Sequence, residues 1–315
     1  MPAPRPLPTE LTEGPFTCGR AATLGVSEKV LRGRRFRRLH PRVWVSASYA
    51  MTFADRVEAA RLALPEGSCV DGGTRHRLLG YDDGAELPLQ FVIDQDQHRD
   101  LDGVFLHRTI ALPPLDAVGV TPAAAFLRCC ERHRLIDLVK RGDWLLHHGH
   151  MTLQELVDLA SEQAWRPGAA QALVVAGWLD AGSRSPRESE LRCLVVACGL
   201  PRPEVNQDLL VNGRWLGCVD VLFRAWLLVL EYEGRQHAED DVQFASDIAR
   251  YAGFRDHGVE YRQVTAAMLA RPRALMLVVH RLLCERGYKG PAPVFGAQWR
   301  ALFEAVPGRG RRGAA

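Results

Sequence analysis

The chain has almost no lysine, no C-x-x-C pair and no long apolar run. Only three lysines, Lys29, Lys140 and Lys289, stand among the forty basic residues, so thirty-seven are arginine. Arginine suits contacts with phosphates and bases, although a biased coding composition of the source genome would give the same ratio. The eight cysteines lack metal-ligand spacing, and Cys193 and Cys198 follow a helical apolar pattern. We therefore expect reduced core thiols rather than a zinc site or disulfides.

The missing apolar runs also exclude the common targeting segments. The proline-rich start, residues 1–8, lacks the apolar core of a secretory signal, and no apolar run approaches the ~20 residues of a membrane span. With 315 residues, 47% of them hydrophobic and 24% charged, the composition is that of a globular protein with two or three domains. We therefore expect a cytoplasmic protein with no membrane partner. The net charge of +3 does not by itself argue for nucleic acid.

Residues 1–13 are proline-rich and polar, and we expect a disordered arm there. Residues 14–50 predict a winged helix-turn-helix, with a helix at Arg20–Leu24 and a second at Glu28–Arg32 capped by Ser27. The next residues, 34–45, alternate between arginine and apolar side chains, which predicts a β wing. The apolar side chains expected to face the core are Phe36, Leu39, Val43 and Val45.

This N-terminal part resembles the winged-helix domain of abortive-infection-type antitoxins, in which such a wing leads into a mixed α/β body. An arginine run is often only a solvated face. Here the arginines flank a candidate recognition helix, so we expect DNA contact. The candidate DNA-binding residues are Arg32, Arg34, Arg35, Arg37 and Arg38.

Residues 51–180 predict a mixed α/β middle domain. Thr52–Ala63 has the pattern of an amphipathic helix, Leu87–Ile93 and Val104–His107 have that of strands, and Thr121-Pro122 begins another helix. The histidines near residue 148 have no cysteine or acidic partner at ligand spacing, so we predict no metal site among them. The sequence predicts no chemistry for this region.

The C-terminal half contains the patterns that carry chemistry. Ser185-Pro186-x-Glu188 predicts a helix start with a capping box. Asn212-Gly213 predicts a β-hairpin, and the apolar run Leu227–Leu230, which ends in charge, predicts a buried strand.

That geometry brings Asp220, on the second hairpin strand, back beside Glu231. Like charges at ~4 Å repel by ~4 kcal/mol at an effective dielectric of ~20, so such carboxylates need a cation, and Mg²⁺ or Mn²⁺ suits oxygen ligands. A helix over Glu239–His257, a strand over Val259–Val264 and a helix over Pro272–Arg286 follow. Residues 288–315 are expected to form a basic flexible tail.

Taken together, the pieces from Ser185 to His237 resemble an uncharacterised actinobacterial family related to very-short-patch-repair endonucleases of the PD-(D/E)xK superfamily. They are Ser185-Pro186-Arg187-Glu188-Ser189, Gly199-Leu200-Pro201-Arg202-Pro203, Asp220, Glu231-Tyr232-Glu233-Gly234 and His237. The resemblance covers residues 185–287 and implies a restriction-endonuclease-like α/β domain, so the fold class expected for the whole chain is multi-domain α/β.

The resemblance also implies roles for individual residues. Asp220 and Glu231 would bind Mg²⁺ or Mn²⁺, joined by the carbonyl of Tyr232, and His237 would position or activate the attacking water. In this superfamily an acidic residue on the first helix often reaches the metal site. The resemblance therefore implies a catalytic role for Glu188 in addition to its role in capping the helix. Glu233 stands where the superfamily usually has lysine and the relatives aspartate, so the lysine role cannot be carried over.

Two functions of different class follow. The first is a Mg²⁺-dependent DNA endonuclease that hydrolyses phosphodiester bonds and is delivered to DNA by the winged helix. The second is a non-catalytic, DNA-binding regulator of antitoxin type, whose degenerate nuclease domain serves binding or homodimer formation. The intact carboxylates favour the first; the antitoxin-like N-terminus and Glu233 favour the second.

Overall fold

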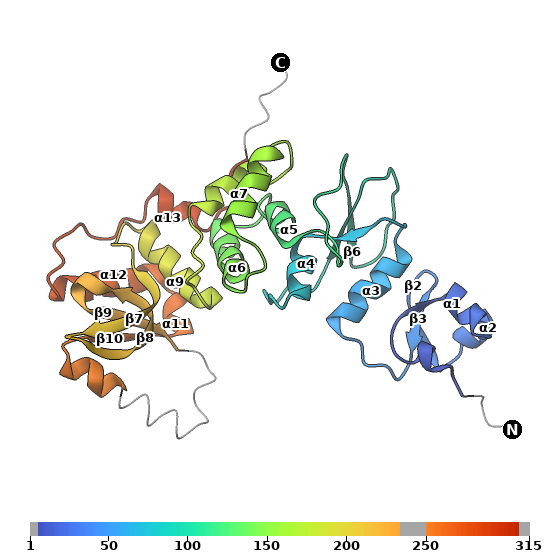
Figure 1. Ribbon diagram of the computed structural model, residues 1–315, viewed down its shortest axis with the longest axis horizontal. Helices are drawn as coiled ribbons and strands as arrows, with labels where there is room; N and C mark the ends of the chain where they lie inside the picture. Colours follow the sequence, from blue (N-terminus) through green and yellow to red (C-terminus); the bar gives the residue numbers. More distant parts are fainter. Residues whose placement is uncertain (1–5, 234–249, 309–315) are drawn as a thin grey trace, which may run out of the picture. The chain divides into compact units, whose positions relative to one another are not determined.

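The computed structural model describes residues 6–233 and 250–308, and the chain divides into two units after Arg128 (Figure 1). Each unit combines helices with small sheets, so the expected mixed α/β class is confirmed. The division falls inside residues 51–180, and it places residues 129–180 with the C-terminal unit. None of the helices in the described part of the chain is long and apolar enough to cross a membrane.

The N-terminal unit begins with a three-stranded antiparallel sheet, in the order β1–β3–β2, that carries two short helices. Leu11 is fully buried in its core, so the expected disordered arm is wrong for residues 6–13, because this apolar side chain anchors the segment. Ser27 precedes the second helix as predicted, but its side chain makes no capping hydrogen bond. The elements are η1 (Thr9–Leu11), β1 (Phe16–Thr17), α1 (Cys18–Thr23), α2 (Glu28–Leu31), β2 (Phe36–His40) and β3 (Val43–Ser46).

A second small sheet, in the order β4–β5–β6, completes this unit, with β5 and β6 parallel. Helix α3 contacts strands of both sheets and so joins the two parts. It begins with a capping box in which Thr52 and Asp55 exchange hydrogen bonds. The elements are α3 (Phe53–Ala63), β4 (Cys69–Val70), α4 (Gly72–Leu78), β5 (Leu89–Ile93), β6 (Val104–Arg108) and α5 (Pro122–Cys129).

The C-terminal unit is built on a four-stranded sheet in the order β10–β9–β8–β7, in which only β9 and β10 are parallel. Asn212 and Gly213 have φ of 51° and 77°, the left-handed pair that a two-residue hairpin of type I′ needs, so the predicted hairpin is confirmed. The strands are β7 (Glu204–Val211), β8 (Arg214–Phe223), β9 (Leu228–Tyr232) and β10 (Glu260–Val264), and η2 (Arg224–Trp226) connects β8 to β9.

Helices cover both faces of this sheet. α9 and α12 lie on one side, and the helical residues 250–256 lie on the other (Figure 1). Phe254 packs with Leu222 and Val229 in the core beneath them. The described elements from α9 to α12 follow the predicted order. The helices are α6 (Leu135–His147), α7 (Leu153–Glu162), α8 (Ala169–Ala176), α9 (Pro186–Ala197), α11 (Ala266–Leu269), α12 (Pro272–Glu285) and α13 (Ala297–Ala301).

A buried ion pair fixes α9 against α6. The side chains of Arg192 and Asp143 are 1% and 0% exposed, and an Arg192 guanidinium nitrogen donates to Asp143 Oδ2 at 2.8 Å. The same nitrogen donates to the carbonyl of Trp178, and the Asp180 N–H donates to Asp143 Oδ1 at 2.7 Å. Burial raises the pKa of the Asp143 carboxyl, opposed by the charge of Arg192. Residues from the predicted middle domain therefore hold the helix that carries Glu188.

The last described segment packs against the C-terminal unit. Trp299, Leu302 and Val306 are buried, and the N–H groups of Leu135 and Ile136 donate to the carbonyls of Glu304 and Leu302. The expected flexible tail is therefore wrong for residues 291–306, because the buried side chains of Trp299, Leu302 and Val306 and these backbone hydrogen bonds hold the segment beside α6 and α9. Residues 309–315 lie outside the described residues.

Candidate functional site

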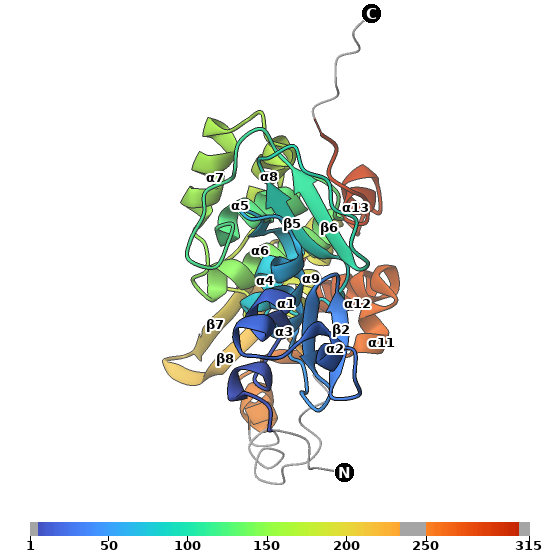
Figure 2. The same cartoon turned by 90° about the vertical axis from the view of Figure 1, so that its right-hand side faces the viewer.

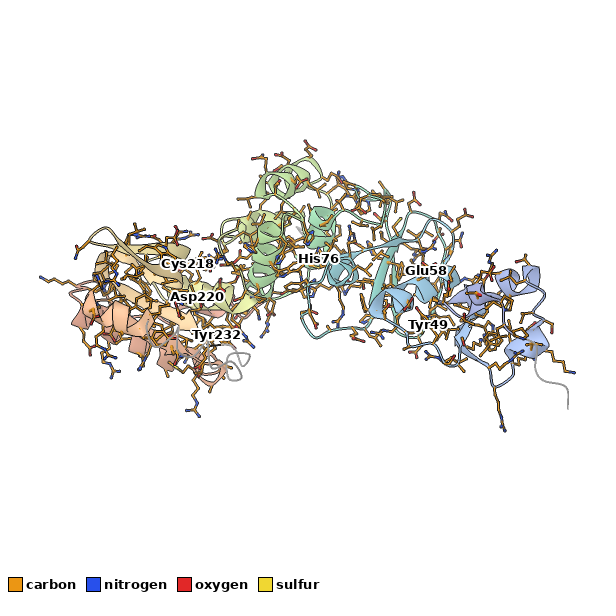
Figure 3. All side chains as sticks on the ribbon, turned by 60° about the horizontal axis from the view of Figure 1, so that its bottom comes forward. Tyr49, Glu58, His76, Cys218, Asp220 and Tyr232 are labelled. Carbon is orange, nitrogen blue, oxygen red and sulfur yellow. The ribbon has the colours of Figure 1, made fainter. Side chains whose placement is uncertain are left out.

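Asp220 lies where strands β8 and β9 begin to separate. The last paired residues are Val221 and Leu230, so one step further along this antiparallel register Asp220 stands opposite Glu231. The N–H of Tyr232 donates to Asp220 Oδ2 at 3.0 Å. Figure 3 labels Asp220 and Tyr232 on these neighbouring strands. The carboxylate thus takes the place of a backbone carbonyl where the ladder ends, and Oδ1 accepts no hydrogen bond from the described residues.

Burial and neighbouring charges act on the ionisation of Asp220. Burial raises the pKa of its carboxyl above the ordinary value, and the nearby charge of Glu188 raises it further. The Tyr232 hydrogen bond and the charges of Arg250 and Arg184 oppose this rise. The carboxylates of Glu188, on α9, and Asp220, on β8, are therefore close enough to interact electrostatically.

Glu188 is 7% exposed and is held in the first turn of α9. Its N–H donates to Ser185 Oγ at 3.2 Å, which confirms the predicted N-cap. The prediction of a full capping box is wrong, because the Glu188 side chain does not accept from the N–H of Ser185. Its Oε2 accepts from the N–H of Arg184 and from the side-chain amide of Asn206. The carboxylate turns from its own helix toward the sheet because a strand residue offers a buried donor.

Asn206 was not anticipated from the sequence. It has φ of 48° within β7, a left-handed conformation that asparagine tolerates better than most residues. Its amide also donates to the carbonyl of Gly182 at 2.8 Å, so it fixes Glu188 relative to the strand. The one available signal was an asparagine after a valine in a segment of strand pattern.

Glu231, on β9, is paired with arginine. A guanidinium nitrogen of Arg250 donates to Glu231 Oε1 and to the carbonyl of Cys218, the latter at 2.6 Å. The side chains of Glu231 and Arg250 are 12% and 28% exposed. In the sequence Arg250 and Asp247 are three residues apart, which allows either a mutual ion pair or a shared cleft. Arg250 pairs with Glu231, and Asp247 lies outside the described residues.

The remaining predicted site residues separate into two cases. Glu233 follows the end of β9 with an exposed side chain, and its N–H donates to the carbonyl of Val264 at 3.0 Å. His237 lies outside the described residues. Within residues 6–233 and 250–308, no three His, Cys, Asp or Glu side chains are placed so that they could hold a metal ion together.

Asp220 and Glu231 nevertheless have the donor chemistry of a magnesium or manganese site. Carboxylate oxygens are the ligands that such hard cations prefer, and Mg²⁺ commonly takes one or two carboxylates and fills its other positions with water. Burial raises the pKa of the Asp220 carboxyl, so a bound cation would stabilise its ionised form. A cation bound there would compete with Arg250 for Glu231.

The candidate DNA-binding arginines lie in the N-terminal unit, around α2 and β2. Most are exposed. Arg32 pairs with Glu28 at 2.7 Å, and Arg37 and Arg38 donate to the backbone carbonyls of Tyr49 and His40. β2 is an edge strand of its sheet. The exposed residues are Arg32, Arg34, Arg37 and Arg38, and Arg35 is half-buried. The fold thus gathers Glu188, Asp220 and Glu231 in one unit and the arginines in the other.

Comparison with known proteins gives distant relatives. Two proteins from strains of Mycobacterium tuberculosis, both named as uncharacterised, are 22% identical to this chain over 189 residues, which is 59% of this chain and 70% of each relative. No protein-family profile matches the chain. No solved structure matches it either.

Proposed function

We propose that this protein is a metal-dependent DNA endonuclease whose site lies at the diverging ends of β8 and β9. The observation that carries the proposal is the placement of Asp220 opposite Glu231, with Glu188 close enough to raise the pKa of Asp220. The element order from α9 to α12 supports a restriction-endonuclease-like core of the PD-(D/E)xK type, as the sequence resemblance implies.

Each residue has a defined part in this proposal. Asp220 and Glu231 would hold Mg²⁺ or Mn²⁺, and the Tyr232 N–H fixes the orientation of the Asp220 carboxylate. The bound cation would offset charge on the scissile phosphate and make an attacking water more acidic. Glu188, positioned by Asn206, would orient that water or the cation. His237 keeps the role of base that the resemblance implies, and the winged helix would deliver the site to DNA.

The pairing of Glu231 with Arg250 favours a second candidate function. Arg250 already compensates the charge of Glu231, so the folded domain does not need a cation to offset repulsion between the two carboxylates. In that case the protein would be a non-catalytic DNA-binding regulator, with the nuclease-like domain kept for binding or dimerisation.

Plasmid cleavage separates the two candidates. Purified full-length protein should nick or linearise supercoiled plasmid with Mg²⁺ or Mn²⁺ and lose this activity with EDTA. Asp220→Asn keeps the shape of the side chain and removes its charge, so it should lower the rate of nicking at least ~10²-fold. Cleavage that survives Asp220→Asn unchanged would rule out this site. Duplex, single-stranded and mismatched DNA should all be tried, and failure on every one favours the regulator.

A further inference from the structure

A pocket of about 390 Å³ lies between strand β8 of the β7–β8 hairpin and the helical residues 250–256. Its walls include Arg214, Trp215, Gly217, Cys218, Arg250 and Gly253. Figure 2 shows the β7–β8 hairpin extending away from α12. Pockets of about 300 Å³ and more are of the size that takes small ligands. Arg250 belongs to both places, since it lines the pocket and pairs with Glu231.

Gly217 allows Arg250 to lie against the strand. It has φ of 121°, and a Cβ built there would be 3.2 Å from Arg250 Nε, so a side chain at this position would displace the guanidinium. The Nε atom is buried and has no hydrogen-bond partner in the described part of the chain. Arg250 therefore brings a positive charge to the wall of the pocket, next to its partner Glu231.

Trp215 gives the pocket an aromatic wall that is held in place. Its side chain is 62% exposed, and its Nε1 donates to Asp208 Oδ1 at 2.9 Å. Leu210, its partner across the hairpin, is 56% exposed, and the strand register shifts between Leu209 and Leu210. Such a bulge redirects side chains. The indole is therefore fixed by a hydrogen bond while much of its surface stays open, which suits a stacking platform.

We infer that this pocket binds an unpaired nucleotide next to the scissile phosphate, with the base on Trp215 and the phosphate on Arg214 and Arg250. The inference rests on the proposed function and names its substrate class: DNA with single-stranded or locally unpaired nucleotides. A base inside a continuous duplex is already stacked on both faces and cannot stack on a protein ring. An unpaired base can, and Arg214 supplies charge for its backbone.

Binding without metal tests the inference in the full-length chain. Fluorescence anisotropy in EDTA would compare a labelled single strand, a duplex with one unpaired nucleotide and a continuous duplex. Trp215→Ala should weaken binding to the first two by about 5- to 100-fold and leave the continuous duplex unchanged, and Trp215→Phe should restore most of the loss. Arg214→Ala should lower the salt slope on the single strand by about 0.7.

Trp165→Ala is the matched control, because Trp165 is 50% exposed and also stands beside an arginine, Arg166, but lies outside this pocket. It should bind all three DNAs like the wild type. Equal affinity of wild type and Trp215→Ala for every DNA would overturn the inference even if Asp220-dependent cleavage is found. Conversely, Trp215-dependent selectivity without cleavage of any DNA supports the pocket while removing the endonuclease.

Discussion

Replacing Arg250 with methionine should increase the affinity of the site for Mn²⁺. Arg250 forms an ion pair with Glu231 and adds positive charge near Asp220. A cation must therefore displace the guanidinium from Glu231 and overcome its repulsion. Methionine removes that charge and still fills the space against Phe254, whose ring lies 5.3 Å from the Arg250 guanidinium carbon. The fold should therefore survive the change.

The magnitude follows from the burial of the pair. Unit charges at ~4 Å interact by ~4 kcal/mol at an effective dielectric of ~20. The Arg250 side chain is 28% exposed, and solvent screening reduces the effect toward ~1–2 kcal/mol. Since ~1.4 kcal/mol is tenfold in affinity, the dissociation constant should fall by about 5- to 30-fold.

Isothermal titration with Mn²⁺ at neutral pH measures this directly. Arg255→Met is the matched control, since Arg255 is an exposed arginine on the same helical segment, 250–256. Its affinity should equal that of the wild type, and adding Asp220→Asn to Arg250→Met should abolish binding. An affinity in Arg250→Met that is unchanged or weaker would refute the competition between Arg250 and the cation. Absence of Mn²⁺ binding in every variant would refute the metal site.

Three further measurements examine other parts of the molecule. Burial raises the pKa of Asp220, so the stability linked to its protonation is present below the unfolded pKa of ~3.9 and is lost as pH rises through the folded value. Without metal, Asp220→Asn should therefore have a higher Tm than wild type near neutral pH. A Tm difference that does not shrink in acid would contradict this. Asp143→Asn leaves the buried Arg192 without its counter-charge and should cost ~3–5 kcal/mol in denaturant unfolding, whereas Asp143→Leu combined with Arg192→Met should cost less; equal losses would argue against an uncompensated charge. Replacing Arg37 and Arg38 together with alanine should weaken duplex binding and reduce its salt slope by ~0.9 per lost phosphate contact, and an unchanged slope would remove the wing from the DNA-binding surface.

Short-range signals in the sequence determined the local structure of the C-terminal unit. Asn212-Gly213 predicts its hairpin because few other residue pairs adopt two left-handed conformations in succession. Ser185 and Pro186 start α9 because one accepts a free N–H and the other has none to satisfy. An apolar run ending in charge located β9, and the connection at Arg224–Trp226 then placed Asp220 opposite Glu231. The hairpin and the helix start are determined within a few residues, and the pairing of Asp220 with Glu231 follows from one connection between consecutive strands.

The tertiary structure decided which partners these residues meet. Asn206 takes the Glu188 carboxylate from its expected capping bond, and Arg250, nineteen residues along the chain, pairs with Glu231. The segment at 291–306 belongs to residues 288–315, which predict a flexible tail because glycine, proline and arginine are frequent there, yet its Trp299, Leu302 and Val306 are buried and it hydrogen-bonds to α6. Residues far apart in the chain are brought together only by packing of the whole unit, and no local pattern encodes that choice. The sequence by itself therefore determined the elements and the candidate carboxylates, whereas the fold alone determined their charge partners and the pocket that Arg250 lines.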